Sequence, residues 1–257
     1  MNFKQSLKCL ATLAIIQSVM SDDLSSIIAH GAKELNIELP PEAEAAFRAY
    51  YDFLEKRGRN VNLTAITGAG EVARLHFLDS LALLNAADFK NAKIIDIGSG
   101  AGFPGVPLKI AEPSIDLTLL DSTGKRVTFL SELCEKLGIE AGCITARAEE
   151  AAHLPAFREQ HDIVVSRAVA RLNVLCELCV PFVRVGGVFI AMKGVESANE
   201  IEEAEGTIEI LGAKVQENFD YMVPGTNIKH RAVIVRKVTQ TAVKYPRRFA
   251  KIQKAPL

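Results

Sequence analysis

The chain has few cysteines, no marked excess of charge of either sign and no apolar run that suits a bilayer. It carries 30 Lys and Arg against 31 Asp and Glu in 257 residues, which gives a formal net charge of −1. A nucleic-acid partner would therefore bind to a local basic patch and would not be attracted by a positive electrostatic potential over the whole protein. The apolar run at residues 9–20 is shorter than the roughly 20 residues that a membrane helix needs. We expect a globular chain with no membrane partner.

The few cysteines are odd in number and unevenly spaced: Cys9, Cys134, Cys143, Cys176 and Cys179. This arrangement argues against the disulfide framework of a secreted domain and indicates a cytoplasmic protein. Cys176 and Cys179 form a C-x-x-C pair inside the apolar helical run 172–183, with no second ligand pair elsewhere in the sequence. We expect packed core thiols there and no metal or redox centre.

The first twenty residues allow three interpretations. Lys4 and Lys8 precede an apolar run in the manner of a signal peptide, but no small-x-small cleavage site follows. The same stretch could form an ordinary amphipathic helix. We favour a third interpretation, in which Met20 is the natural start, because Ser21-Asp22-Asp23 provides a helix N-cap and an acidic first turn. Residues 1–20 would then be an extension.

A glycine-rich turn follows a predicted buried strand at residues 93–97. Gly98, Gly100 and Gly102 alternate with other residues, so the backbone can turn sharply and come close to a nucleoside ligand. The spacing is G-x-G-x-G, whereas a dinucleotide-binding turn has G-x-G-x-x-G and places a helix N-terminus on a pyrophosphate. Asp96, two residues before the first glycine, would suit a cationic ligand. We therefore predict S-adenosylmethionine, which carries an ammonium and a sulfonium, as the cofactor.

An acidic residue about twenty positions further on completes this nucleoside signal. The predicted strand at residues 115–120 delivers Asp121 to its carboxyl end, where this fold class binds the two ribose hydroxyls. Because NAD also carries a ribose, Asp121 does not separate the two cofactors. The alternative is that Asp121 only caps the helix that begins near Thr123.

Alternating strands and helices from residue 93 predict a parallel, doubly wound α/β sheet of the Rossmann-like type. The further strands are predicted near residues 140–145, 161–166 and 187–192, and three helices precede them near 22–36, 41–56 and 71–84. Lys214–Tyr221 and Arg231–Lys237 are joined through Pro224-Gly225 without a helix, which predicts a terminal antiparallel hairpin. Together these features describe the seven-stranded, mostly parallel sheet of a class I methyltransferase with N-terminal helices.

Residues at the strand ends are the candidates for ligand contact. Phe103 could pack against the ligand or anchor the following helix. Ala148 and Glu149 lie where an adenine would sit, although Glu149 could instead be a first-turn helix acid. Arg167 ends the fourth strand, where a guanidinium needs a carboxylate or phosphate partner. Lys193 ends the fifth.

The charges are unevenly distributed along the chain. From Arg236 to Leu257 there are seven Lys and Arg and no Asp or Glu, with Tyr245 and Phe249 among them. Residues 196–209 are instead rich in glutamate and should face away from any polyanion. The basic tail is either an RNA contact or only a solubilising end.

A set of motifs extends well beyond a generic glycine turn. They are Asn62-Leu63-Thr64, His76 with Asp79-Ser80, Asp96-Ile97-Gly98-Ser99-Gly100-Ala101-Gly102-Phe103-Pro104-Gly105, Leu119-Leu120-Asp121-Ser122 with Lys125 and Phe129-Leu130, Ser166-Arg167-Ala168, Lys193-Gly194 and Arg231. In order and spacing the chain resembles, over about residues 22–240, the bacterial RsmG family, also called glucose-inhibited division protein B.

The resemblance implies an enzyme that methylates N7 of one guanine of 16S ribosomal RNA, guanine 527 in the usual RNA numbering, with S-adenosylmethionine as donor. It places cofactor contacts on Gly98, Phe103, Ala148, Glu149 and Arg167, to which the turn and the second strand add Gly100 and Asp121. As a hypothesis, Arg167 and Lys193 line the acceptor pocket while Asn62, His76 and Asp79 orient its wall. His76 and Asp79 could equally be a helical i, i+3 pair.

Some features depart from the family or stay open. Family members commonly have a tryptophan before the Asn62 motif, but this chain has Arg57-Gly58 there and no tryptophan at all. A stacking platform in that loop is therefore not supported. No catalytic dyad is evident, which fits attack by the N7 lone pair, because no proton then has to leave. A nicotinamide-dependent oxidoreductase and a non-catalytic RNA-binding scaffold remain as alternatives.

The motifs divide the chain into four segments. We predict an extension at 1–20, a helical segment at 21–88, a methyltransferase domain at 89–238 and a basic tail at 239–257. The partner is expected to be 16S rRNA within the small ribosomal subunit or an assembly intermediate, and the protein is expected to be a monomer without a metal.

Overall fold

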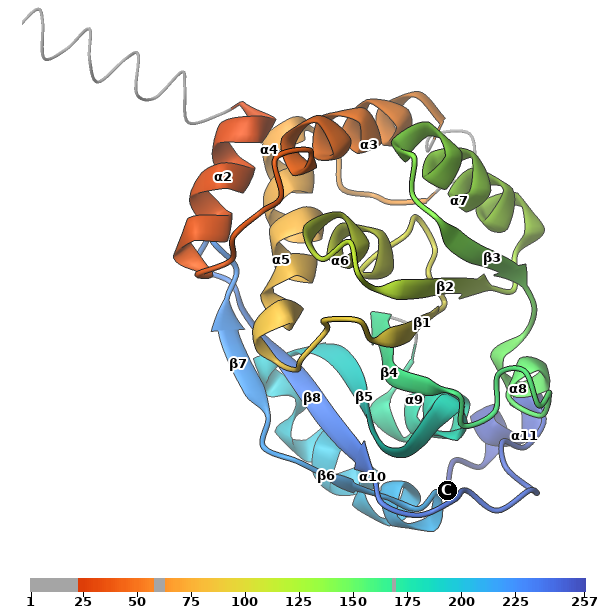
Figure 1. Cartoon of the computed structure of the whole chain (residues 1–257). Coiled ribbons are helices and arrows are strands. Elements are labelled where there is room, and N and C mark those ends of the chain that lie inside the picture. The colour runs from red at the N-terminus through yellow and green to blue at the C-terminus, as the bar shows by residue number, and fades with distance from the viewer. Residues whose placement is uncertain (1–22, 58–62, 168–169) are drawn as a thin grey trace, which may run out of the picture.

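The computed structural model describes residues 23–57, 63–167 and 170–257, and these form a sheet covered by helices on both faces (Figure 1). Predictions that concern residues 1–20, Gly58, Asn62 and Ala168 lie outside the described residues.

Five parallel strands build the main part of the sheet. They are β1 (Lys93–Ile97), β2 (Asp116–Asp121), β3 (Ala141–Thr145), β4 (His161–Arg167) and β5 (Val183–Gly194). The strand order begins β3-β2-β1-β4-β5, so it reverses between β1 and β4. Ligands of open α/β sheets lie beyond the carboxyl ends of the strands at such a reversal. The predicted doubly wound architecture is confirmed.

The remaining strands are antiparallel and pair around β8 (Lys229–Lys237). One edge of β8 pairs with β5, and the other edge pairs with both β6 (Ala213–Val215) and β7 (Phe219–Met222). The predicted hairpin through Pro224-Gly225 is therefore present. The predicted count of seven strands was wrong, because the described residues form a sheet of eight.

The extra strand comes from an interruption that the sequence pattern does not reveal. Between β6 and β7 the pairing with β8 shifts by one residue, because Val215 pairs with Val235 whereas Phe219 pairs with Ala232. Within this interval the Gln216 N–H donates to the Ile234 carbonyl of β8 at 2.8 Å. A local irregularity of this kind splits one strand into two short ones on the same edge.

Helices cover the two faces of the sheet as two groups (Figure 1). One group consists of α2 (Leu24–Glu34), α3 (Ala43–Arg57), α4 (Ala69–Val72), α5 (Asp79–Leu81), α6 (Gly105–Ala111) and α7 (Gly124–Leu137). The other consists of α8 (Ala148–Ala151), α9 (Leu172–Cys179), α10 (Ala198–Ile210) and α11 (Phe249–Lys254). Short 3-10 turns occupy Ala82–Asn85, Val180–Phe182 and Val195–Ser197.

Each face of the sheet has its own apolar core. Ile94 and Leu119 pack with the first group of helices, whereas the adjacent Ile95 and Leu120 pack with the second. Successive strand residues point to opposite faces, so a sheet buried on both faces needs continuous apolar strands. Cys176 and Cys179 are fully buried in the second core, as expected, and burial raises the pKa of both thiols.

A π-helical turn interrupts the helix that was predicted at 71–84. The chain is helical from α4 through α5, but Ala73–Leu78 forms the wider π turn. Such turns are rare and often lie at functional sites. This one carries His76 and ends immediately before Asp79, two residues that the sequence singled out.

The end of the chain folds against the second group of helices. Tyr245 and Ile252 are buried, and the Thr207 hydroxyl on α10 donates to the Leu257 carbonyl at 2.7 Å. The α11 helix within this segment was not predicted. In the parts of the chain that the structure describes, no helix combines the length and apolar character required to cross a membrane.

Candidate cofactor and acceptor site

The glycine turn between β1 and α6 uses backbone conformations that favour glycine. Gly98, Gly100 and Gly102 have φ values of +74°, +57° and +103°. A Cβ at Gly102 would lie 2.7 Å from the Tyr50 hydroxyl. At Gly100 its nearest neighbour would be the Gly98 carbonyl oxygen at 3.8 Å. Gly102 is therefore packed against the N-terminal helices, while Gly100 leaves bare backbone at an open position.

Asp96 lies beneath this turn and is completely buried. Its Oδ2 accepts the Gly105 N–H at 2.9 Å, whereas its Oδ1 has no hydrogen-bond partner among the described residues. Burial raises the pKa of Asp96 from 3.8 to about 7. The side chain is not among those that line the cavity described below. That Asp96 faces a cationic ligand therefore stays a prediction. Its oxygen without a hydrogen-bond partner is compatible with such a ligand.

The raised pKa of Asp96 has a measurable consequence for stability. A carboxyl whose pKa is higher in the folded chain contributes stability that is full below pH 3.8 and is lost as the pH rises through about 7. Relative to Asp96→Asn, the free energy of unfolding of the wild type should fall by about 1.4 kcal/mol per pH unit across this window. The free energy of unfolding of both proteins is measured in urea at pH 4.5, 5.5 and 6.5. The contributions of all other titrating groups cancel in the difference between the two proteins. A constant difference would contradict the assignment.

Asp121 at the end of β2 closes the turn from the other side. Its Oδ2 accepts the Gly100 N–H at 3.1 Å, and its Oδ1 accepts the Thr123 N–H at 2.8 Å. Arg126 lies 3.5 Å from Oδ2. Asp121 thus bonds to the start of the helix, as the alternative interpretation expected, and also to the glycine turn. A carboxylate has about four acceptor positions, so room remains for ribose hydroxyls.

The turn and the end of β2 border a cavity of about 400 Å³. It is lined by Leu63, Thr64, His76, Gly98, Ser99, Gly100, Ala101, Phe103, Asp121, Ser122, Arg126 and Arg167. The volume lies within the range of ordinary small-ligand sites. Five of the seven predicted cofactor residues meet at this one cavity: Gly98, Gly100, Phe103, Asp121 and Arg167.

Phe103 is the centre of an aromatic stack at the cavity. Its ring is nearly parallel to those of His76 and Tyr50, at centroid distances of 4.4 and 5.3 Å. The guanidinium carbon of Arg167 lies 4.9 Å from the Phe103 centroid, within cation–π range. Tyr50 also donates to the Ala101 carbonyl at 2.6 Å. Phe103 therefore anchors the turn to α3 and still borders the cavity.

His76 is held neutral beside Arg167. Burial, reinforced by the Arg167 charge, lowers the pKa of His76 from 6.5 to about 3. The guanidinium is always protonated, so it donates to His76 Nδ1 at 3.0 Å and to the Leu75 carbonyl at 3.1 Å. The ring proton is then on Nε2, which lies 2.8 Å from the Thr64 hydroxyl oxygen. Both ring nitrogens are thus engaged.

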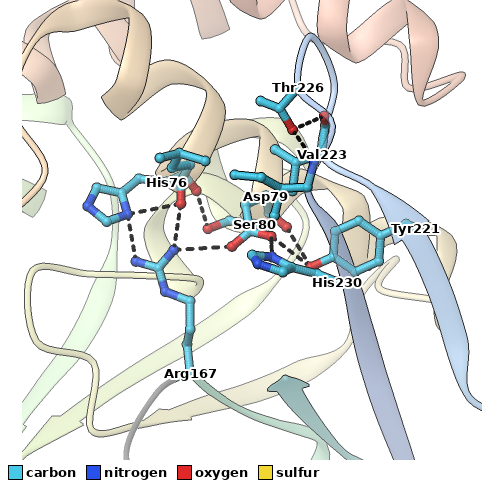
Figure 2. Close-up of polar contacts among 10 residues, drawn as sticks. His76, Asp79, Ser80, Arg167, Tyr221, Val223, Thr226 and His230 are labelled. Carbon is cyan, nitrogen blue, oxygen red and sulfur yellow. Dashed lines mark hydrogen bonds and ion pairs between the residues drawn. The ribbon is translucent and has the colours of Figure 1, made fainter. Parts of the chain in front are cut away.

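Asp79 connects this pair to the terminal hairpin, as Figure 2 shows. Its Oδ2 lies 3.4 Å from the Arg167 guanidinium. Its Oδ1 accepts from Tyr221 at 2.8 Å and from His230 Nδ1 at 2.7 Å. The hydrogen bond to Asp79 raises the pKa of His230. His76 and Asp79 are therefore bridged through Arg167, with no hydrogen bond between their side chains among the contacts of the described chain.

The structure places the remaining predicted residues away from the cavity. Lys193 donates to the Ala170 carbonyl at 2.7 Å and to Glu200 at 3.1 Å, and it does not line the cavity. Glu149 accepts from Arg147 at 2.6 Å and borders a different cavity, next to α11. Ala148 packs against the second core and does not line the first cavity either.

Several residues of this site carried no usable signal in the sequence. Tyr221 and His230 are more than 140 residues from Asp79 along the chain, so only the folded hairpin brings them to it. Arg126 lines the cavity but lies in an ordinary helix, whereas Ser122 could have been found, because it follows Asp121 in the same motif. Thr64 could have been found, because it belongs to the same motif as Asn62.

Comparison with solved structures agrees with the fold. Two solved structures share the fold, with TM-scores of 0.56 and 0.51: a branched-chain polyamine synthase mutein from Thermus thermophilus and M. jannaschii TYW2 in complex with AdoMet. The first is 13% identical and the match covers 79% of this chain and 66% of that one; the second is 10% identical and covers 69% and 80%.

Closer relatives are found by sequence. The Ribosomal RNA small subunit methyltransferase G of Alkaliphilus oremlandii is 44% identical over 91% of this chain and 99% of its own length. The protein of the same name from Thermoanaerobacter sp. strain X514 is 44% identical over 93% and 100%. A family model described as rRNA small subunit methyltransferase G matches residues 43–229. The chain therefore belongs to the rRNA small subunit methyltransferase G family, as its motifs predicted.

Proposed function

We propose that this protein transfers a methyl group from S-adenosylmethionine to N7 of guanine 527 in 16S rRNA. Membership of the family supports methyl transfer to small-subunit rRNA. The observation that carries the proposal is the meeting of the glycine turn, Asp121, His76 and Arg167 around one cavity. The choice of guanine and of N7 rests on the motifs shared with the family.

The residues at the cavity fit an adenosylmethionine. Gly100 offers bare backbone, and the two carboxylate oxygens of Asp121 retain acceptor capacity for the ribose hydroxyls. Gly98 and Phe103 would contact the amino-acid part, and the Asp96 oxygen without a partner lies beneath the same turn. Ala148 and Glu149 would contact the adenine. They follow β3, the strand next to β2 at the same edge of the sheet.

The site favours a reaction that needs no general base. When bound, S-adenosylmethionine supplies a methyl group on a positively charged sulfur. Guanine N7 has a free lone pair and carries no hydrogen, so no proton has to be removed when it accepts the methyl group. His76 stays neutral and has both nitrogens engaged, so it is poorly placed to remove a proton. Catalysis would then come from holding the guanine in line with the methyl group.

Arg167 and His76 are proposed to line the acceptor pocket. Arg167 is positioned by Asp79 and by its stack on Phe103, so its donors are fixed before RNA binds. Asn62 and Lys193 remain proposed members of this pocket. Lys193 could reach the acceptor pocket only if its ammonium exchanged its contact with Glu200 for a contact with the RNA.

We also propose where the protein acts and what role each segment of the chain has. The protein would act as a monomer in the cytoplasm, on the small ribosomal subunit or an assembly intermediate. Segments 21–88, 89–238 and 239–257 would supply the helical cover, the catalytic domain and an RNA-binding tail.

The proposal is tested by methyl transfer from labelled S-adenosylmethionine to small subunits purified from cells that lack this gene. Mass mapping should locate one new methyl group, on N7 of guanine 527. Asp121→Asn should raise the KM for S-adenosylmethionine by about tenfold or more, because an NH2 group, which donates hydrogen bonds, replaces one of the two carboxylate oxygens that accept them. Asp116→Asn is the matched control, since Asp116 is an exposed residue at the other end of β2. Absence of transfer by the wild-type protein, or methylation elsewhere, would refute the proposal.

A further inference from the structure

The basic end of the chain is held in a fixed conformation on the protein surface. Residues 238–257 contain five Lys and Arg and no Asp or Glu. Arg158 donates to the Thr241 and Tyr245 carbonyls at 2.7 and 2.9 Å, and His153 Nε2 lies 2.9 Å from the Pro246 carbonyl oxygen. The cations of this segment are therefore presented by an ordered scaffold.

One of these cations has a structural role, and the other four do not. Arg247 forms an ion pair with the buried carboxylate of Glu177 through its Nε and Nη2 atoms, at 2.8 and 2.6 Å. The other four are exposed: Lys244, Arg248, Lys251 and Lys254. Lys244 contacts the Tyr245 ring, and none of the four has an ion pair among the contacts of the described residues.

A second cavity opens beside these cations, between α8 and α11. Its volume is about 700 Å³. It is lined by Arg147, Glu149, Glu150, His153, Pro246, Arg248, Phe249 and Ala250. The Arg147 guanidinium lies over the Phe249 ring at 4.8 Å and also binds Glu149 at 2.6 Å, which offsets the charge of that carboxylate. The cavity thus contains two planar groups, the Arg147 guanidinium and the Phe249 ring, which are already stacked on each other.

The cavity lies on the same edge of the sheet as the cofactor site. Arg147 follows the carboxyl end of β3 by two residues, and Thr145 at that end pairs with Asp121 in the neighbouring strand. The Ala146 N–H donates to the Asp121 carbonyl at 3.2 Å. The two cavities therefore lie beyond the ends of neighbouring strands, at the same edge of the sheet.

We propose that the surface formed by Arg147 and residues 244–254 is a docking site for single-stranded or looped RNA next to the methyl-transfer site. The exposed cations would contact phosphates, and an unstacked base would lie against Phe249 and Arg147. The glutamate-rich α10 would keep the polyanion off its own surface. This inference rests on the proposed function, because it assumes an rRNA substrate.

The test is the double charge reversal Arg248→Glu with Lys251→Glu in the full-length protein. We expect the KM for small subunits to rise about tenfold or more while kcat and the affinity for S-adenosylmethionine stay unchanged. The slope of log affinity against log salt should become shallower by about 0.7 for each phosphate that the variant no longer binds. The matched control is Lys90→Glu with Lys214→Glu, two exposed lysines near the amino-terminal edge of the parallel strands.

A second variant tests the stacking contact. Phe249→Leu keeps an apolar side chain but removes the ring, so we expect about a fivefold loss of affinity with no change in the salt slope. Equal KM values for the double reversal and its control would overturn the docking site, and unchanged affinity of Phe249→Leu would overturn the stacking contact. Failure of the wild-type protein to methylate would instead refute the proposed function, so the two failures are distinguishable.

Discussion

Arg167→Ala is expected to lower kcat/KM for RNA methylation by about 100-fold or more, because reacting groups lose their alignment when a positioning contact is removed. The same change leaves the buried Asp79 carboxylate without its guanidinium partner. Because Asp79 keeps its contacts with Tyr221 and His230, we expect this loss to destabilise the protein by about 1 to 3 kcal/mol. Steady-state methylation of small subunits gives the first quantity, and urea unfolding gives the second.

Arg167→Lys separates loss of activity from loss of stability. An ammonium keeps the positive charge near Asp79, but it lacks the planar fork that reaches both His76 Nδ1 and the Leu75 carbonyl. We expect most of the stability to return and most of the activity to remain absent. Full methylation by Arg167→Ala would remove this residue from the site.

Gly102→Ala should disrupt the glycine turn and destabilise the whole domain. At a φ of +103° an alanine is strained, and its Cβ would lie 2.7 Å from the Tyr50 hydroxyl and 2.9 Å from a methyl group of Val106. Strain together with overpacking costs about 2 to 5 kcal/mol. Binding of S-adenosylmethionine should weaken as well, because the displaced turn forms one wall of the cavity.

Gly138→Ala is the matched control for this prediction. Gly138 also has a positive φ, +64°, but a Cβ there would meet nothing within 4 Å among the described residues. Its substitution should therefore cost only the backbone penalty, about 1 to 2 kcal/mol. If urea unfolding finds the two variants equally destabilised, the close packing of the turn against Tyr50 is not what requires glycine at position 102.

The local sequence pattern predicted the sheet and the glycine turn with good accuracy. Strand β1 was placed at its observed bounds, and β2 and β3 began one residue later than predicted. Strands β1 and β2 carry buried residues on both faces, so each is a short, largely apolar run between turn residues. The turn was readable because its positive φ values demand glycine at alternate positions.

Features that depend on distant segments could not be predicted in the same way. The Asp79 cluster joins three segments, and no spacing in the sequence links Tyr221 to Arg167. Lys193 ends its strand as expected, but its ammonium pairs with Glu200, which a strand-end rule cannot foresee. The break between β6 and β7 likewise follows no periodicity.

The π turn at Ala73–Leu78 makes the length of this helix critical. In an α-helix, successive residues lie about 100° apart around the axis, so deleting Phe77 or Leu78 would leave His76 and Asp79 two residues apart, about 200° around the axis. His76 and Asp79 then could not both face Arg167. Insertions and deletions between residues 73 and 79 should therefore be poorly tolerated, because Ala73 and the residues from His76 to Asp79 are also buried.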